Sequence, residues 1–251
     1  MAWDFIVTGW RRSGTTMFTS LLKAHPAVSC DNESFNYFFH GDSYFDFLRA
    51  PPPRRAAGVQ MAGIKLLDPF LVPHWMYRRI FVRARREGVA DTLPSYGDYS
   101  EMIAAVTAGF VASQPKVLNV VRHALYVYVS EQIALQRREF KYKTPFEARF
   151  SHVFDLDHFL RWFRTKREIE RRVAFLKPEG LCLNVFYEDL MSSEHRDETI
   201  REVFQHIGVD PTSVEPGTVK QLPTRLTEYV LNYDEMIAAL KASPYPHLAP
   251  E

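Results

Sequence analysis

Three features follow one another within the first 25 residues: a short apolar run, a loop with a glycine at each end, and an amphipathic stretch. The apolar run Phe5–Val7 ends at Gly9, and the amphipathic stretch begins near Gly14, with apolar residues at helical spacing. This order predicts a buried strand, a tight loop and a helix. Free backbone N–H groups and the positive end of the helix dipole attract an anion at such a helix start. We therefore predict a phosphate-binding loop at residues 9–14.

The spacing of this loop is that of a nucleotide P-loop with one substitution. Its two glycines enclose four residues, as in G-x-x-x-x-G-K-[ST], but Thr15 occupies the lysine position and is followed by Thr16. A P-loop kinase or ATPase needs that lysine on the β- and γ-phosphates. Here the cations come earlier, at Arg11 and Arg12. The loop therefore keeps the anion-binding backbone and lacks the kinase lysine.

Length and charge limit the class of protein. The chain has 251 residues, of which 46% are hydrophobic, enough for one substantial core, so we expect a single domain over residues 1–251. Lysine and arginine number 31 against 30 acidic residues, which gives a net charge of +1. This balance argues against a nucleic-acid partner.

The cysteines and the first residues bear on location. Cys30 and Cys182 lie far apart and outside any C-x-x-C pattern, so we expect neither a disulfide framework nor a cysteine zinc site. The first strand begins too early to leave room for a signal peptide. No apolar run approaches the roughly 18 residues that span a bilayer. These features predict a cytoplasmic protein without a membrane anchor.

Short apolar segments alternate with helical patterns along the rest of the chain. Strands are predicted at 59–67, 116–121 and 181–186, and helices at 34–48, 74–86, 99–112, 124–139, 156–176, 194–207 and, as one or two helices, 222–240. The Pro51–Pro53 run marks an extended surface connection. The alternation predicts a P-loop-like three-layer α/β/α fold with a central, mostly parallel sheet flanked by helices. Ligands of such sheets bind at the carboxyl ends of the strands.

The Arg-Ser-Gly-Thr-Thr sequence at residues 12–16 resembles the 5′-phosphosulfate loop of sulfotransferases that use 3′-phosphoadenosine-5′-phosphosulfate (PAPS). The resemblance implies that PAPS is the cosubstrate. It also implies that Arg12 contacts the bridging oxygen and the 5′-phosphate, where the family places its loop cation. The residues then expected to bind the cofactor in this loop are Arg11, Arg12, Ser13, Gly14, Thr15 and Thr16.

A second candidate element follows the strand at 116–121. Arg122 ends that strand, and Ser130 lies eight residues later in the next helix. A strand-end arginine can pair bidentately with a phosphate, and a hydroxyl two turns along adds a donor. The Arg-x7-Ser spacing resembles the sulfotransferase element that binds the 3′-phosphate of the cofactor.

Two later segments extend the resemblance. Residues 184–190, Asn-Val-Phe-Tyr-Glu-Asp-Leu, resemble the end of a late family strand whose tyrosine lies near the adenine, which makes Tyr187 a cofactor-binding candidate. The segment around Val219 and Lys220 resembles bacterial relatives, which carry Arg-Lys-Gln there. Val219 replaces that arginine, and Lys220 remains a candidate for a secondary phosphate contact.

A hydroxyl acceptor needs a general base, because an alcohol is a poor nucleophile until its proton begins to leave. Many family members carry a histidine two residues after a strand lysine, whereas here Lys65 is followed by two leucines. Other members use a glutamate after the second strand, a position that Glu33 matches. The resemblance thus implies Glu33 as the base and Lys65 as a cation on the moving sulfonate, with His123 and His152 as reserve bases. The sequence contains no H-E-x-x-H or similar pairing, so we do not expect a metal site.

The sequence therefore predicts a PAPS-dependent sulfotransferase with three catalytic residues, Arg12, Glu33 and Lys65. The acceptor implied is a small molecule or carbohydrate, with a carbohydrate or secondary-metabolite hydroxyl favoured by the glutamate base. Two alternatives stay open: an ATP-dependent small-molecule kinase, and a non-catalytic nucleotide-binding module. Neither an oligomeric state nor the identity of the acceptor follows from these residues.

Overall fold

The computed structural model describes residues 3–31, 58–67, 114–137, 151–215, 217 and 225–250. Its centre is a sheet of five strands, in the order β2-β3-β1-β4-β5, and all four pairings between neighbours are parallel. The strands are β1 (Phe5–Gly9), β2 (Val28–Asp31), β3 (Met61–Leu67), β4 (Lys116–Val121) and β5 (Cys182–Phe186). The predicted parallel sheet is thus confirmed.

The strand order places a switch point beside β1. From β1 the chain builds β2 and β3 on one side, then crosses to β4 and β5 on the other side. Connections leaving the sheet in opposite directions open a crevice at the carboxyl ends of β1 and β4. The loop after β1 and Arg122 after β4 therefore flank the same crevice.

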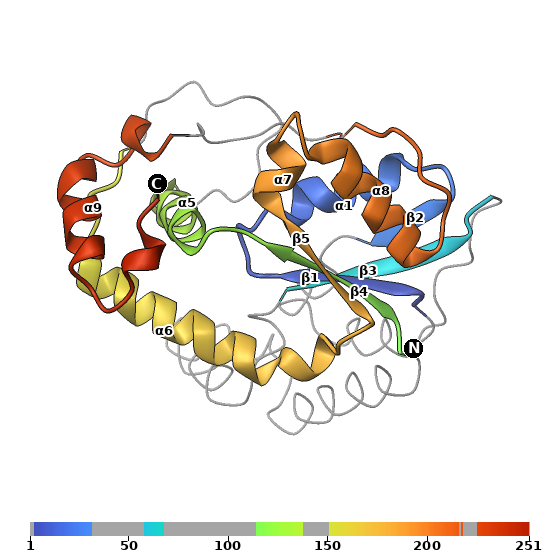
Figure 1. The fold of residues 1–251 in the computed structure, drawn as a ribbon, viewed down its shortest axis with the longest axis horizontal. Helices are drawn as coiled ribbons and strands as arrows, with labels where there is room; N and C mark the ends of the chain where they lie inside the picture. Colours follow the sequence, from blue (N-terminus) through green and yellow to red (C-terminus); the bar gives the residue numbers. More distant parts are fainter. Residues whose placement is uncertain are drawn as a thin grey trace, which may run out of the picture.

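Helices cover both faces of the sheet, which makes three layers (Figure 1). One face carries α1 (Thr15–Ala24), α7 (Tyr187–Met191) and α8 (Arg196–Ile207), and the opposite side carries α6 (Leu156–Arg172). Strand and helix side chains form one core between the sheet, α1 and α8, for example Phe5, Phe18 and Phe204, each fully buried. Burial of apolar strands on both faces is what a parallel sheet requires.

A second core lies beyond the carboxyl ends of the strands, around α5 (Ala124–Arg137) and α9 (Tyr233–Lys241) (Figure 1). Its centre is Tyr128, whose ring lies 5.1 Å from that of Phe159 and 5.4 Å from that of Trp162, centroid to centroid. The side chain of Asn232 joins the segment before α6 to the segment before α9, because it both donates to and accepts from the Phe154 backbone. This core supports α5, which carries Ser130.

Several element boundaries differ from the prediction; for example, the strands predicted at 59–67 and 181–186 begin at Met61 and Cys182. The helix predicted at 156–176 ends at Arg172, and a 3-10 turn, Ala174–Leu176, follows. The helix at 194–207 begins at Arg196, and α7 was not predicted. The segment 222–240 holds a 3-10 turn, Leu226–Glu228, and α9. The helices predicted at 34–48, 74–86 and 99–112 and the proline run lie outside the described residues.

Among the residues that the structure describes, no helix combines the length and the apolar character that crossing a bilayer requires.

We expect Gly63→Ala to destabilise the sheet, because a methyl group there would lie 2.1 Å from the ring of Phe5 on the neighbouring strand. Overpacking of this kind costs about 1–3 kcal/mol in free energy of unfolding, measurable by urea denaturation. Gly217→Ala is the control, since a methyl group there meets nothing within 4 Å. Equal stability of the two variants would contradict the packing argument.

Candidate functional site

The loop between β1 and α1 is held in an unusual backbone conformation. Three residues have positive φ: Gly9 at 145°, Arg12 at 68° and Gly14 at 97°. Arg12 is not a glycine, so its left-handed conformation costs about 1–2 kcal/mol. Both the backbone N–H and the hydroxyl of Ser13 donate to the Trp10 carbonyl, at 3.1 and 2.6 Å. These bonds fold the loop back on itself.

The loop leaves the start of α1 available to an anion. Gly14 is the N-cap residue and has no side chain that could bond the N–H groups of the first turn, and the first turn contains no acidic residue. Glycine is required at position 14 for two reasons. Its φ of 97° disfavours other residues, and a Cβ there would lie 2.3 Å from the Tyr187 ring. Tyr187, in the first turn of α7, therefore packs directly on the loop. Unfilled N–H groups and a favourable dipole make this helix start suited to an anion.

The two arginines singled out in the sequence lie side by side. Arg122 Nη1 donates to the Arg12 carbonyl at 3.1 Å, and Arg12 Nε donates to Ser130 Oγ at 3.2 Å. The guanidinium carbon of Arg122 also lies 4.4 Å from the centre of the Tyr187 ring, a cation–π distance. The loop, the end of β4, α5 and α7 thus bring four predicted residues together at the switch point.

Lys65 reaches the same loop from β3. Its side chain is almost fully buried, 1% exposed, and Nζ donates to Thr16 Oγ1 at 3.1 Å. The charge of a buried lysine acts over a longer range than that of an exposed one, because water screens it less. Lys65 therefore adds positive charge beneath the first turn of α1.

Three buried nitrogen atoms have no hydrogen-bond partner among the described residues: Nε of Arg122, Nδ1 of His123 and Nε2 of His152. Buried polar groups nearly always have a partner, and the first two atoms lie directly after β4, where a ligand of the crevice could supply one. Burial lowers the pKa of His123, with smaller contributions from His247 and Arg122 in the same direction and an opposing one from Glu188. The imidazole is thus held in its neutral form.

The tyrosines around Arg122 remain protonated. Burial raises the pKa of Tyr187 and of Tyr126, against the lowering effect of Arg122, and it raises the pKa of Tyr229 to about 12. Their hydroxyl groups are therefore neutral hydrogen-bond donors at any physiological pH.

Glu131 is a residue of this region that sequence reasoning missed. It follows Ser130 in α5, its side chain is only 3% exposed, and it forms an ion pair with Arg11. The indole N–H groups of Trp10 and Trp162 donate to the other carboxylate oxygen of Glu131, at 3.4 and 3.3 Å. In the sequence, Glu131 looks like an ordinary acidic residue on a helix surface.

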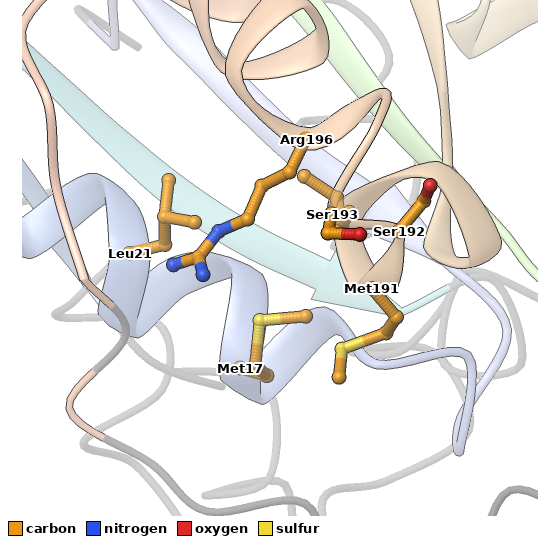
Figure 2. A pocket seen from close by; sticks show the side chains of 7 residues that line it. Met17, Leu21, Met191, Ser192, Ser193 and Arg196 are labelled. Atoms are coloured by element: carbon orange, nitrogen blue, oxygen red, sulfur yellow. The ribbon is translucent and has the colours of Figure 1, made fainter.

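An apolar pocket of about 190 Å³ lies between α1, α7 and the start of α8 (Figure 2). Met17 and Leu21 line it from α1, and Met191 lies opposite. Arg196 enters from α8, with its guanidinium donating to Glu215 Oε2 at 2.6 Å. Met17 is in the first turn of α1, so the pocket adjoins the anion site.

The remaining predicted residues fall outside this cluster. Glu33 and Lys220 lie outside the described residues. His152 is buried beside α5, where its backbone pairs with Tyr229 and Leu231. Within the described ranges, no group of three His, Cys, Asp or Glu side chains is placed to hold a metal ion.

The fold and the loop define an α/β protein with a P-loop-like turn at the switch point of a parallel sheet. The chain belongs to the sulfotransferase family, whose model, described as "Sulfotransferase family", matches residues 4–213. None of the curated proteins matches it significantly.

Two sulfotransferases are among the solved structures that match this chain. A sulfotransferase from Alicyclobacillus acidocaldarius has 12% identity and a TM-score of 0.45, covering 96% of this chain and 92% of that one. Mouse sulfotransferase SULT7A1 complexed with PAP has 14% identity and a TM-score of 0.46, covering 85% of this chain and 61% of that one.

The lowered pKa of His123 predicts a pH-dependent stability. Below the ordinary histidine pKa of about 6.5 the unfolded chain binds the proton more readily than the folded one, so the free energy of unfolding falls as the pH drops. Burial lowers the pKa of His152 and of His206 as well, so they contribute in the same direction. Urea unfolding measured between pH 7.5 and 5.5 should show that the free energy of unfolding falls less steeply with falling pH for His123→Asn than for the parent. His195→Asn is the control, since that ring is exposed; a His123→Asn slope equal to the parent's would refute the assignment.

Proposed function

We propose that this sulfotransferase uses PAPS and transfers its sulfonate to an acceptor hydroxyl. The supporting observation is the double contact in which Arg122 Nη1 donates to the Arg12 carbonyl while Arg12 Nε donates to Ser130 Oγ. It sets a helix-start anion site directly beside a strand-end arginine with a buried, unpartnered Nε. A nucleotide with phosphates on both the 3′ and the 5′ positions needs two such sites, whereas the single phosphate chain of ATP needs one.

In this proposal the loop receives the 5′-phosphate end of the cosubstrate. The backbone N–H groups of the first turn of α1 and the hydroxyls of Ser13, Thr15 and Thr16 donate to it, and Arg12 supplies charge. Arg11 is paired with Glu131, and in this proposal it contacts the phosphate from the loop entrance through the guanidinium donors that this ion pair leaves, since its side chain is 45% exposed. Charge-assisted donors of this kind stabilise the charge that develops on the leaving phosphate.

Arg122 and Ser130 receive the 3′-phosphate. Arg122 Nε is a donor that the described residues leave unused, and a guanidinium presents further donors in a fixed plane. Lys220 is proposed as a secondary contact on the same phosphate.

The adenine lies near Tyr187 in this proposal, with the pocket next to Met17 as its place. A purine has apolar faces and a polar edge, and the pocket combines two methionine side chains with the hydroxyls of Ser192 and Ser193. Thioethers adapt to flat aromatic surfaces and interact favourably with them. The pocket adjoins the first turn of α1, which fits a base joined through a ribose to phosphates in the loop.

When bound, PAPS supplies an activated sulfonate on the bridging oxygen of its phosphosulfate. The acceptor oxygen forms a bond to sulfur as the bond from sulfur to that bridging oxygen breaks. Glu33, two residues after the end of β2, takes the hydroxyl proton, and Lys65 balances charge on the sulfonate oxygens. Arg12 stabilises the phosphate that leaves. The acceptor is proposed to be a carbohydrate or secondary-metabolite hydroxyl.

The identity of the cosubstrate is tested by comparing thermal unfolding with adenosine 3′,5′-bisphosphate and with ATP–Mg²⁺. Adenosine 3′,5′-bisphosphate at ~100 times its Kd should add about 2.7 kcal/mol to the free energy of unfolding, because it binds only the folded state. ATP with Mg²⁺ should add far less, since Thr15 replaces the lysine of a kinase loop. Stabilisation by ATP–Mg²⁺ alone would instead favour the kinase alternative. Pyrophosphate is the control for nucleoside recognition and should stabilise the protein less than the bisphosphate.

Arg122→Ala should weaken binding of adenosine 3′,5′-bisphosphate by about 10- to 100-fold, because a charge-assisted contact to a phosphate is lost. Isothermal calorimetry measures the change. Arg201→Ala is the matched control: it removes an exposed arginine from α8 and should leave the affinity unaltered. If Arg122→Ala bound the bisphosphate as tightly as the parent, Arg122 would not belong to the site.

A further inference from the structure

Glu131 is a buried carboxylate with an unusual set of partners. Its side chain is 3% exposed, yet it is paired with Arg11 and accepts from the indoles of Trp10 and Trp162. These partners come from the loop after β1 and from α6, so Glu131 joins both to α5. Taking a carboxylate out of water is unfavourable unless it is paired and hydrogen-bonded, and a well-packed apolar residue serves stability equally well. Stability alone therefore does not explain this residue.

The partners of Glu131 and of Ser130 are consecutive residues of the phosphate loop. Glu131 contacts Trp10 and Arg11, and Ser130 accepts from Arg12. Arg12 is the residue with φ of 68°, a conformation that persists only where its surroundings enforce it. One turn of α5 thus holds the loop at the strained position and at the two residues before it.

We propose that Glu131 is a positioning residue for the 5′-phosphate site: it holds Trp10 and Arg11 so that Arg12 and the free N–H groups of α1 keep their anion-binding arrangement. This inference rests on the proposed function. Among the described residues, the hydrogen bonds and the ion pair of Glu131 go to Trp10, Trp162 and Arg11, and none joins it to α1 or to Arg122. We therefore expect its removal to affect the 5′-phosphate side more than the 3′-phosphate side. Arg11 has a matching task, because it neutralises a buried negative charge that would otherwise repel a phosphate.

The test compares two ligands that each carry one phosphate, adenosine 5′-monophosphate and adenosine 3′-monophosphate, by calorimetry. Glu131→Gln keeps the shape of the side chain and removes its charge. We expect the affinity for the 5′ ligand to fall about tenfold, the loss typical of a charge-assisted contact, and that for the 3′ ligand to change less than about threefold. A residue that merely stabilised the fold would weaken both ligands equally. Glu168→Gln, which removes a carboxylate paired with Arg171 on the exposed side of α6, is the control and should change neither.

The second measurement asks whether the effects of substituting Arg11 and Glu131 on the affinity for adenosine 5′-monophosphate add. Arg11→Gln leaves the Glu131 carboxylate without its cation, so it should weaken the 5′ ligand more than Glu131→Gln does. The double variant Arg11→Gln/Glu131→Gln should then bind the 5′ ligand more tightly than Arg11→Gln alone. Additive losses would overturn the proposed neutralisation.

A milder variant covers the case in which Glu131→Gln fails to fold. Trp162→Phe keeps an aromatic ring and removes one donor to Glu131, so it should lower the 5′ affinity relative to the 3′ affinity in the same direction by a smaller factor. An unchanged ratio of the two affinities in every folded variant would overturn the inference alone. A parent protein that bound neither ligand would overturn the proposed function and the inference with it.

Discussion

The hydrogen bond from Arg122 to the Arg12 carbonyl joins the two sides of the switch point, and the arrangement of the candidate site depends on it. β1 has β3 on one side and β4 on the other, so the segments that follow β1 and β4 leave the sheet in opposite directions. The hydrogen bond adds a link from the end of β4 to a loop that α5 already contacts through Ser130 and Glu131. The bond uses a backbone carbonyl as acceptor, so it fixes the main chain of the loop rather than a side chain.

The strained backbone of the loop at Arg12 is stabilised by the contacts that anchor the loop. A tight turn from a strand into a helix requires positive φ at several residues, and at position 12 the chain carries an arginine instead of a glycine. The cost of that conformation is offset by contacts with α5 and β4, which come from a packed region around Tyr128. A loop held in this way before ligand arrives has little ordering left to do on binding. The second core thus contributes to the site without lining it.

The sequence predicted the first strand, the loop and the helix after it because their signals are local: an apolar run, glycine spacing and helical periodicity within 25 residues. The parallel sheet followed from the alternation of short apolar segments with helical patterns along the rest of the chain. The sequence also named Arg12, Arg122 and Ser130, which the structure brings together. It missed α7, because that helix follows β5 without a turn and its Tyr-Glu-Asp residues read as a strand end. It missed the role of Glu131 because its partners Trp10 and Trp162 are 121 and 31 residues away, and periodicity assigns a glutamate to an exposed face.

The candidate site is strongly positive although the chain as a whole is nearly neutral. The net charge of +1 gives no sign of an anionic ligand, yet Lys65, Arg12 and Arg122 gather around one helix start. Buried or partly buried cations act through a medium of low dielectric constant, so a few of them create a strong local potential. Glu131 cancels Arg11 next to them, which leaves the positive charge concentrated where the N–H groups of α1 also point. Such a local arrangement suits the doubly phosphorylated ligand of the proposed function, and the balanced surface limits non-specific attraction to other polyanions.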